Sequence, residues 1–449
     1  MLLQGSRSQL GLTTLAAIDT FSLEAGEHPH CIECVTMGER HFFVVGTGWD
    51  HPMESETTSG RIVGLELVPS RWKNGDRELV LAFCQKVRGG VNALVGAAGG
   101  LVAAINSQVV FYTTRPSKSA ERELSLARRG AWACAFFATT LVAPPQEPER
   151  LLVGDAMRSL VVLKLDASRG AVSEVAREAD PSWTSAVEQL SAQAQTYVGA
   201  DMSFNLFASA RTLVTPSVRR RKEEAVVAMR AVGTTGLDGE VREVGEGEGS
   251  SNTEPALERE FTHVIKRRGA FHLGDMVNRF RKGELASSSC LFVQLAQLPG
   301  SPSPFFHSFA LAGALVHAEG LSVLGERVKP NVVFGTAGGA LGMLADLGPR
   351  LTRVLSEVVE ALDEEVPTLG GISLREWRAY RTEHREVGAH GVVDGDALVG
   401  RLLGLDAEER GAVLARWRAE RRGGEEAGEE GGVDEEGLVD AIASLARLC

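Results

Sequence analysis

Short apolar runs separated by turn residues recur from Leu10 to Asp346. Most runs are followed by a second one across a break rich in Gly, Asp or Thr, as in FFVVGTGWD before GRIVGLELV, LLVGDAM before SLVVLKLD, and TYVGADM before FNLFAS. β-Branched and aromatic residues dominate the runs and helical spacing is absent, which indicates strands. Because Gly and Asp accept the dihedral angles of tight turns, each pair predicts a hairpin that turns at the break.

The spacing of the breaks predicts the architecture. They lie near Gly46, Asn106, Gly154 and Gly199. The unit therefore recurs every ~45 to 60 residues, which is typical of four-stranded propeller blades. We expect a mainly β fold in which residues 1–348 form consecutive blades of a β-propeller.

Residues 210–258 interrupt the propeller pattern. They carry RRRKEE and then GLDGEVREVGEGEGSSNTEP, with few large apolar residues after Val241. Such a segment cannot bury enough apolar surface to offset the entropy lost on ordering. We therefore expect a disordered, solvated insertion between two strands.

The apolar period changes after Pro349. The first helical stripe, with intervals of three and four, consists of Leu351, Val354, Leu355, Val358 and Leu362. Asp406 and Glu409 have the spacing of a helix N-terminus ahead of a second apolar stripe. Beyond a linker rich in Gly and Glu, the last helix is marked by Leu438, Ile442 and Leu445. Residues 349–449 are therefore expected to form a small all-helical domain.

Length and charge narrow the possible functions. The chain has 449 residues, enough for two or three folding units, and its 44% apolar and 24% charged residues are ordinary for a soluble globular protein. A formal net charge of −12 weighs against binding nucleic acid by phosphate neutralisation, which needs a basic face. No apolar run reaches the ~18 to 20 residues of a membrane span, so no membrane partner is expected. The six scattered cysteines predict reduced thiols in the cytosol or nucleus.

Recognisable catalytic patterns are missing from the sequence. It contains no G-x-S-x-G, H-E-x-x-H or G-x-x-x-x-G-K motif. The best metal candidate is Cys31 with Cys34, near several histidines, but structural zinc needs four ligands and the segment reads equally well as a strand. We expect no enzyme, no metal and no cofactor.

Several longer motifs resemble the C-terminal region of the damaged-DNA-binding protein 1 family. In chain order they are GDAMRSLVVLKL, AREADPSWTSAVE, GADMSFNLF, GAFHLGDMVNRFRKGEL and VVFGTAGGALGMLADL. EWRAYRTEHRE and GVVDGDALVGRLLGL are similar to that family's C-terminal helical domain. Similar blades occur in the large subunit of the cleavage and polyadenylation specificity factor. The resemblance covers nearly the whole chain.

The resemblance implies a non-catalytic adaptor linked to DNA repair and protein ubiquitination, located in the nucleus, with the cytoplasm as an additional location. Family members consist of three propellers and a helical tail; one propeller docks on cullin-4, and the first and third hold WD-repeat substrate receptors. This chain resembles the third, seven-bladed propeller and the tail, so cullin-4 docking is not carried over to it. Because the family motifs begin near Thr13, the propeller is expected to lack its opening blades, through a partial gene model or because another polypeptide supplies them.

Matching the motifs position by position also implies a partner-binding surface. It consists of Arg158, Trp183, Met276, Val277 and Asn278, with Phe136 added across a gap in the alignment. Trp and Arg are common anchors of protein interfaces, whereas the alternative places Trp183 and Met276 in the core, as is usual for large apolar side chains. A rival function, a nucleic-acid-binding subunit of an mRNA 3′-end processing or splicing complex, predicts a basic track on one propeller face.

Overall fold

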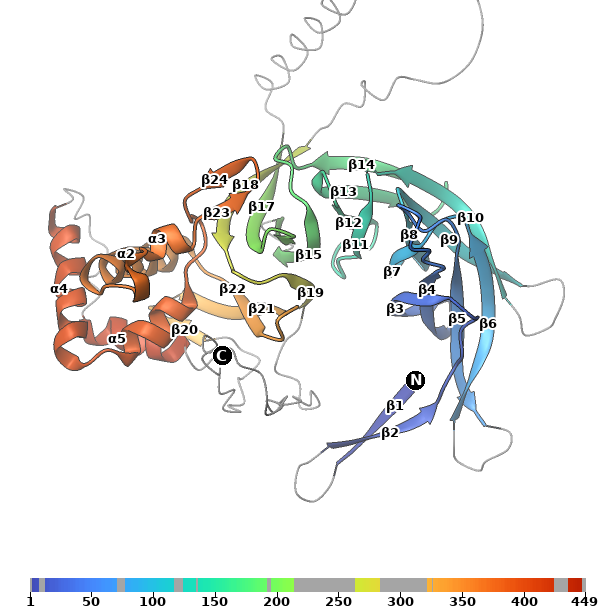
Figure 1. Cartoon of the computed structure of the whole chain (residues 1–449), viewed down its shortest axis with the longest axis horizontal. Coiled ribbons are helices and arrows are strands. Elements are labelled where there is room, and N and C mark those ends of the chain that lie inside the picture. The colour runs from blue at the N-terminus through green and yellow to red at the C-terminus, as the bar shows by residue number, and fades with distance from the viewer. Residues whose placement is uncertain are drawn as a thin grey trace, which may run out of the picture.

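The computed structural model describes residues 2–7, 13–70, 77–116, 124–134, 136–191, 195–213, 263–282, 321–324, 326–423 and 435–445. Within these stretches, five four-stranded antiparallel sheets follow one another in chain order around a common centre (Figure 1). We number them sheets one to five. The expected mainly β, propeller-like arrangement is confirmed.

The strands of the five sheets have the following bounds. Sheet one consists of β3 (His28–Met37), β4 (Arg40–Gly48), β5 (Gly60–Pro69) and β6 (Arg77–Val87). Sheet two consists of β7 (Val91–Ala97), β8 (Gly100–Ile105), β9 (Gln108–Pro116) and β10 (Leu124–Ala133). Sheet three consists of β11 (Ala138–Val142), β12 (Arg150–Asp155), β13 (Ser159–Asp166) and β14 (Ala171–Arg177). Sheet four consists of β15 (Thr184–Ser191), β16 (Thr196–Asp201), β17 (Asn205–Leu213) and β18 (His263–His272). Sheet five consists of β19 (Val277–Lys282), β20 (Leu321–Val323), β21 (Glu326–Thr336) and β22 (Leu341–Asp346).

The first strand of each sheet lies nearest the centre and packs against the first strand of the next sheet (Figure 1). Buried apolar side chains lie between neighbouring sheets; one cluster contains Val44 of sheet one and Leu94 of sheet two, and another contains Phe111 of sheet two and Leu151 of sheet three. Each fully buried side chain of this size contributes roughly 1.5–3 kcal/mol. Inner strands such as β8 and β12 are buried along nearly their whole length, so the burial of apolar side chains on both of their faces holds neighbouring sheets together.

The predicted breaks only partly coincide with turns. Asn106 lies in the turn between β8 and β9 with a φ of 46°. In contrast, Gly46, Gly154 and Gly199 lie inside strands, so the expectation of turns at these glycines was wrong by a few residues. Close packing explains Gly199, because a Cβ there would lie 2.2 Å from the Phe207 ring on the paired strand.

The predicted insertion lies mostly outside the described residues. Its first positions, 210–213, belong to β17, and residues 214–262 are not described. β17 and β18 are hydrogen-bonded neighbours in sheet four. The insertion therefore joins two adjacent strands without separating them.

Sheets five and one approach each other across the centre of the arc. Arg279 on β19 donates a 2.6 Å hydrogen bond to Glu33 on β3, and Arg281 lies 3.7 Å from the same carboxylate. A separate hairpin of β1 (Leu2–Arg7) and β2 (Thr13–Asp19) extends away from the sheets (Figure 1). On the face of sheet one turned away from sheet two, Ile32 and Leu81 are 56% and 43% exposed.

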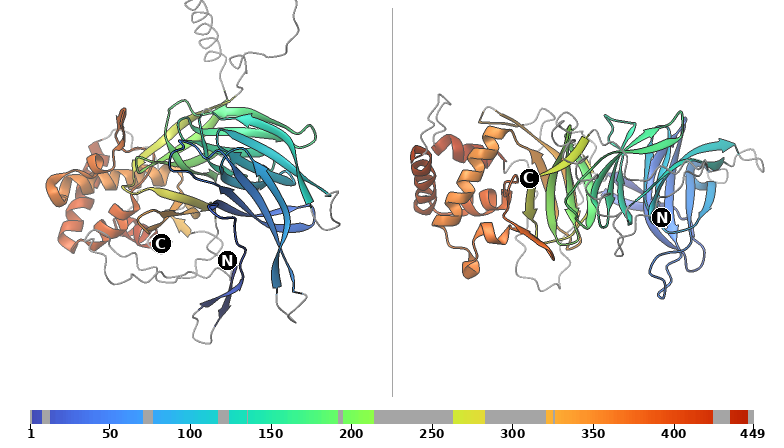
Figure 2. Two further views of the ribbon diagram at one scale, coloured as in Figure 1. Left: turned by 45° about the vertical axis from the view of Figure 1, so that its right-hand side comes forward. Right: turned by 90° about the horizontal axis from the view of Figure 1, so that it is seen from above.

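Helices and short elements follow sheet five in the chain, and the helices among them lie at one end of the row of sheets (Figure 2). They are α2 (Pro349–Glu365), η1 (Leu369–Gly371), α3 (Leu374–Trp377), β23 (Tyr380–Thr382), β24 (Arg385–Val387), η2 (Asp396–Arg401), η3 (Leu402–Gly404), α4 (Ala407–Gly423) and α5 (Glu435–Leu445). The stripe predicted from Leu351 to Leu362 is buried along α2. The predicted helix start is also confirmed, because the Glu409 N–H donates a 2.8 Å bond to Asp406.

The tail is not all-helical, which corrects the sequence-based expectation. The segment EWRAYRTEHRE forms α3 and then the β23–β24 hairpin. Tyr380 on this hairpin is 1% exposed and its hydroxyl lies 3.1 Å from Ser182 Oγ in the segment that enters sheet four. Contact with the propeller thus fixes an extended conformation that local periodicity did not predict.

The helices share their core with sheet five. Val323 on β20 and Val328 on β21 lie in the same buried cluster as Leu355, Leu402 and Trp417. The tail is consequently packed on the propeller and is not joined to it only by a flexible connection.

Candidate functional site

Large apolar side chains are exposed where the chain enters and turns within sheets three and four. They are Phe136 (49% exposed), Met157 (44%), Trp183 (54%), Met202 (44%) and Phe204 (45%), here named the apolar rim. Exposed apolar side chains that gather in one region cost solvation free energy unless something covers them, and such a region typically marks a binding surface.

Strand register places the apolar rim at one end of the two sheets. Ala138 at the start of β11 pairs with Asp155 at the end of β12, and Thr184 pairs with Asp201 in the same way. The entering segments therefore lie beside the turns, as shown by the 2.8 Å bond from the Met202 N–H to the Trp183 carbonyl. Sheets three and four pack side by side through β11 and β15, so the two parts of the rim are neighbours.

Two buried aspartates hold the turns of the apolar rim. Asp155 Oδ1 accepts backbone bonds of 2.9 and 3.1 Å from Met157 and Arg158, and its Oδ2 accepts one of 3.2 Å from Phe136. In sheet four, Asp201 Oδ1 accepts backbone bonds from Ser203 and Asn205. Both aspartates are fully buried or nearly so. Because charged acceptors make strong bonds to backbone N–H groups, these carboxylates fix the turns before any partner arrives.

Phe204 has a backbone conformation that its side chain disfavours. Its φ is 65°, in the left-handed region that bulky residues rarely adopt. Two sets of hydrogen bonds hold this conformation. The N–H groups of the flanking residues donate to Asp201, and the Phe204 carbonyl accepts a 2.9 Å bond from the Leu273 N–H. Local strain of this kind concentrates at binding sites.

The candidate partner-binding residues named from the sequence differ in how far they are exposed. Phe136 and Trp183 belong to the apolar rim, Arg158 and Asn278 are exposed, and Met276 is half-buried in the segment entering sheet five. The alternative of a core position for Trp183 does not fit its 54% exposure.

Val277 differs from the expectation of a surface residue. It is 1% exposed and packs with Phe280 and Phe334 in the core between sheets four and five. Its neighbour Asn278, at an irregularity in the pairing of β19 with β21, is the one that reaches solvent.

Sequence reasoning did not include Met157, Met202 and Phe204. A usable signal exists, because each follows a strand-ending Asp in a turn, where polar residues are the norm.

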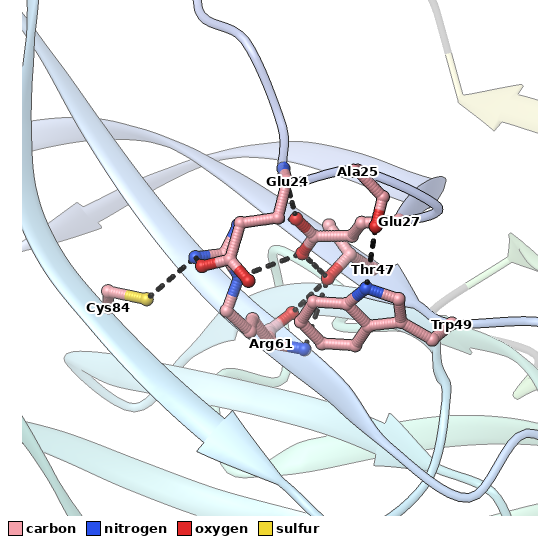
Figure 3. Close-up of polar contacts among 7 residues, drawn as sticks. All are labelled: Glu24, Ala25, Glu27, Thr47, Trp49, Arg61 and Cys84. Carbon is pink, nitrogen blue, oxygen red and sulfur yellow. Dashed lines mark hydrogen bonds and ion pairs between the residues drawn. The ribbon is translucent and has the colours of Figure 1, made fainter.

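Apart from the apolar rim, a cluster of polar side chains joins the segment before β3 to sheet one (Figure 3). The Arg61 guanidinium donates two hydrogen bonds to the Glu27 carboxylate and one of 2.5 Å to Glu24. It also lies 5.5 Å from the centre of the Trp49 ring. Thr47 Oγ1 also donates to Glu27. Every group drawn has a partner within the cluster, so this is an internal clasp and not an open site.

The clasp predicts a pH dependence of stability. Burial alone would raise the pKa of Glu27, but the bonds from Arg61 and Thr47 outweigh it and hold this pKa below its usual value. Glu27 is therefore protonated at a higher pH in the unfolded chain than in the folded one. Its contribution to the free energy of unfolding is fully present above a pH of ~4.3 and is lost as the pH falls below that value. In urea unfolding between pH 6 and 3, Glu27→Gln is expected to reduce the loss of stability on acidification; an unchanged pH slope would contradict this.

The basic residues of β19 do not form an open basic track. Arg279 and Arg281 both contact Glu33. Burial raises the pKa of the neighbouring Glu188, while Lys282, Arg281 and Arg279 act in the opposite direction. Glu33 and Glu188 on the neighbouring strands partly offset the positive charge of β19. The arrangement therefore does not favour the alternative of a nucleic-acid-binding subunit.

The two thiols considered as metal ligands do not converge. Cys31 pairs with Gly46 and Cys34 with Phe43, so their side chains point to opposite faces of sheet one. Burial raises the pKa of Cys31 to about 12. Among the described residues, no group of three or more His, Cys, Asp or Glu side chains is placed to hold a metal ion. In the same part of the chain, no helix has the length and apolar character needed to cross a membrane.

Comparison with known proteins agrees with the propeller and its tail. The model of the family described as the CPSF A subunit region matches residues 9–400. DNA damage-binding protein 1 of Solanum lycopersicum is 27% identical over 388 residues, which cover 86% of this chain and 28% of that protein. DNA damage-binding proteins 1a and 1b of Arabidopsis thaliana are each 26% identical, over 86% and 80% of this chain and 28% and 25% of their own lengths.

This chain thus spans little more than a quarter of the length of the curated relatives it matches. The matched region contains all five sheets and continues into the tail as far as η2. Since this match covers most of its residues, the chain belongs to the family of the CPSF A subunit region.

Proposed function

We propose that this chain is a non-catalytic protein-binding scaffold that receives WD-repeat substrate receptors of a cullin-4 RING ubiquitin ligase, in the nucleus and in the service of DNA repair. The observation that carries the proposal is the apolar rim, an exposed set of Met and aromatic side chains on turns that are already rigid. Rigid aromatic anchors supply most of the binding energy in many interfaces at little entropic cost. The similarity to DNA damage-binding proteins 1 supports the adaptor class.

The partner-binding residues that we assign are the apolar rim together with Arg158, Met276 and Asn278. Arg158 follows Met157 in the turn held by Asp155. Met276 is tied to the neighbouring turn of sheet five by a 2.8 Å bond from the Ala337 N–H to its carbonyl. These residues extend the rim at both ends and add polar contacts to it.

The scaffold is proposed to be part of a seven-bladed propeller, residues 1–348, followed by a C-terminal domain, residues 349–449. The exposed face of sheet one, with Ile32 and Leu81, has the apolar character of the faces that are covered between sheets. Two further sheets between sheets five and one would cover it and close the ring. Docking on cullin-4 is assigned to parts of the relatives that this chain does not span.

The test is direct binding of a purified WD-repeat receptor to the full chain, followed by biolayer interferometry. Trp183→Ala is expected to weaken binding about 30-fold or more, because a central Trp anchor is lost. Arg158→Glu is expected to weaken it as well. The matched control is Arg169→Glu, which reverses an exposed charge in the turn at the opposite end of β13 and is expected to change nothing. Unchanged binding of both Trp183→Ala and Arg158→Glu would refute the assigned surface.

A further inference from the structure

A group of polar side chains lies between sheets three and four, at the end opposite the apolar rim. Arg150 begins β12 and Tyr197 lies near the beginning of β16, whereas the aspartates that hold the rim turns end the same two strands. Gln189 on β15 pairs with Tyr197, and Arg211 lies on β17 of the same sheet. These four residues are here named the inter-sheet cluster. Tyr197 and Gln189 are fully buried, and the Arg211 side chain is 1% exposed.

Glu147, in the connection between β11 and β12, is the carboxylate in contact with this cluster. Its Oε1 lies 3.2 Å from Arg150 Nε and 3.8 Å from Arg211 Nη2, and its Oε2 accepts a 3.4 Å bond from Gln189 Nε2. Charge-assisted N–H···O bonds are normally about 2.7–2.9 Å long, so all three contacts are long. One carboxylate therefore faces two guanidinium groups without a close bond to either.

Four atoms of the inter-sheet cluster are buried and have no hydrogen-bond partner among the described residues. They are Arg150 Nη1, Arg211 Nη1, the Tyr197 hydroxyl and Gln189 Oε1, and they make up four of the nine side-chain atoms in this condition in the described part of the chain. An unpaired buried donor or acceptor is unfavourable, so such groups are rare in folded proteins. The clasp around Arg61 differs, because each group drawn there has a partner.

The four atoms define the hydrogen bonds that a ligand has to supply. Arg150 and Arg211 can only donate, and Gln189 Oε1 can only accept. Burial, with the charge of Glu147 acting in the same direction, raises the pKa of Tyr197 to about 12, so its phenol keeps its proton at neutral pH and can donate. A group that pairs with all four atoms needs a negative charge, several acceptor oxygens and one O–H donor.

Inorganic phosphate has this combination, because at neutral pH it is an anion that retains a P–OH group. Sulfate has the oxygens without the O–H, and a phosphate monoester is largely the dianion without one. We propose that the inter-sheet cluster binds inorganic phosphate, with Arg150, Arg211 and Tyr197 donating to its oxygens and Gln189 Oε1 accepting from its P–OH group. The site lies at the other end of the sheets from the apolar rim, so it is independent of the proposed function.

Glu147 competes with phosphate for the two guanidinium groups. Its side chain is 20% exposed and belongs to a connection at the surface. Rotation about its own side-chain bonds therefore brings the carboxylate into solvent while the strands stay in place. The carboxylate holds the position that phosphate takes, and its removal is expected to favour the ligand.

The experiment is isothermal titration calorimetry of inorganic phosphate into the full chain at pH 7 and constant ionic strength. Saturable binding at one site is expected, with sulfate and phenyl phosphate each about 10-fold weaker, because they leave Gln189 Oε1 unpaired. Equal affinity for sulfate would overturn the role of the P–OH group, and equal affinity for phenyl phosphate would overturn the choice of free phosphate over a phosphoryl group. If none of the three binds, the cluster is internal only and the proposal is wrong.

Two variants of the site are expected to act in opposite directions. Glu147→Gln should tighten phosphate binding about 10-fold, because the competing charge is lost, and Arg150→Gln should weaken it about 10-fold. Glu149→Gln and Arg169→Gln make the same changes at exposed positions outside the cluster and should alter the affinity less than about 2-fold. Thermal unfolding without phosphate verifies that each variant is folded. If Glu147→Gln does not tighten binding, or if the controls have equal effects, phosphate responds to overall charge and the assigned site is refuted.

Discussion

Replacing Glu178 by alanine is expected to lower the free energy of unfolding by about 3–5 kcal/mol, because it leaves a buried guanidinium without its counter-charge. Glu178 is 3% exposed and accepts bonds from Arg267 Nε at 3.0 Å, from Ser209 Oγ at 2.8 Å and from Ser159 Oγ. Urea unfolding followed by circular dichroism at pH 7 measures the effect.

Arg267 is the group left unpaired by this change. Its side chain is 7% exposed and lies over the rings of Phe207, at 4.4 Å, and Tyr380, at 5.1 Å. Burial opposes its charged form, but the charge and hydrogen bond of Glu178 outweigh burial and raise the pKa of Arg267. Without Glu178, the cation stays charged in an apolar setting, and the contact between sheet four and the β23–β24 hairpin weakens with it.

An exposed ion pair in the same hairpin provides the control. Glu386 lies 3.2 Å from Arg381, with both side chains more than half exposed. Exposed pairs contribute ~0–1 kcal/mol, so Glu386→Ala should cost no more than that. Equal costs for the two Glu→Ala changes would contradict the assignment of a buried charge pair.

Trp417→Ala is expected to cost a comparable 3–5 kcal/mol, through the loss of buried apolar surface and the cavity that remains. Trp417 on α4 is 2% exposed, and its indole N–H donates to Glu357 at 3.3 Å. Because Val323 and Val328 belong to the same core, hydrogen exchange should rise in β20 and β21 as well as in the helices.

Trp183→Ala and Trp377→Ala are matched controls, since they make the same chemical change at exposed positions. Each is expected to change stability by no more than about 0.5 kcal/mol. If Trp417→Ala resembled these two, or if exchange rose in the helices alone, the shared core would not transmit the loss to sheet five.

Local pattern was sufficient for much of this fold. The stripe from Leu351 to Leu362 predicts α2 and its buried face, because helical periodicity reports burial directly. Paired apolar runs likewise predict hairpins, because the apolar positions of a strand are the buried ones. The glycines were misplaced since their role is close packing: Gly199 makes room for a ring on the next strand, and nothing in the local sequence reveals that ring's direction.

Contacts between distant segments lay beyond the reach of pattern. Tyr380 meets Ser182 across 198 positions of the chain, so its strand conformation depends on a partner that no local window contains. The surface positions of Trp183 and Arg158 came from resemblance alone. Met202 and Phe204 could have been added from the sequence, as apolar residues in a turn held by an Asp.

The pair between Glu33 and Arg279 bears on how the arc of sheets forms. It joins residues 246 positions apart, whereas neighbouring sheets are linked by short connections. Closing so large a loop is entropically unfavourable, so this contact should form after the sheets have stacked one upon another. A pair this exposed stabilises by less than about 1 kcal/mol, and its attraction is weakened by salt. The curvature of the arc is therefore set by side chains between sheets, and raising the ionic strength should release the two ends from each other without unfolding either.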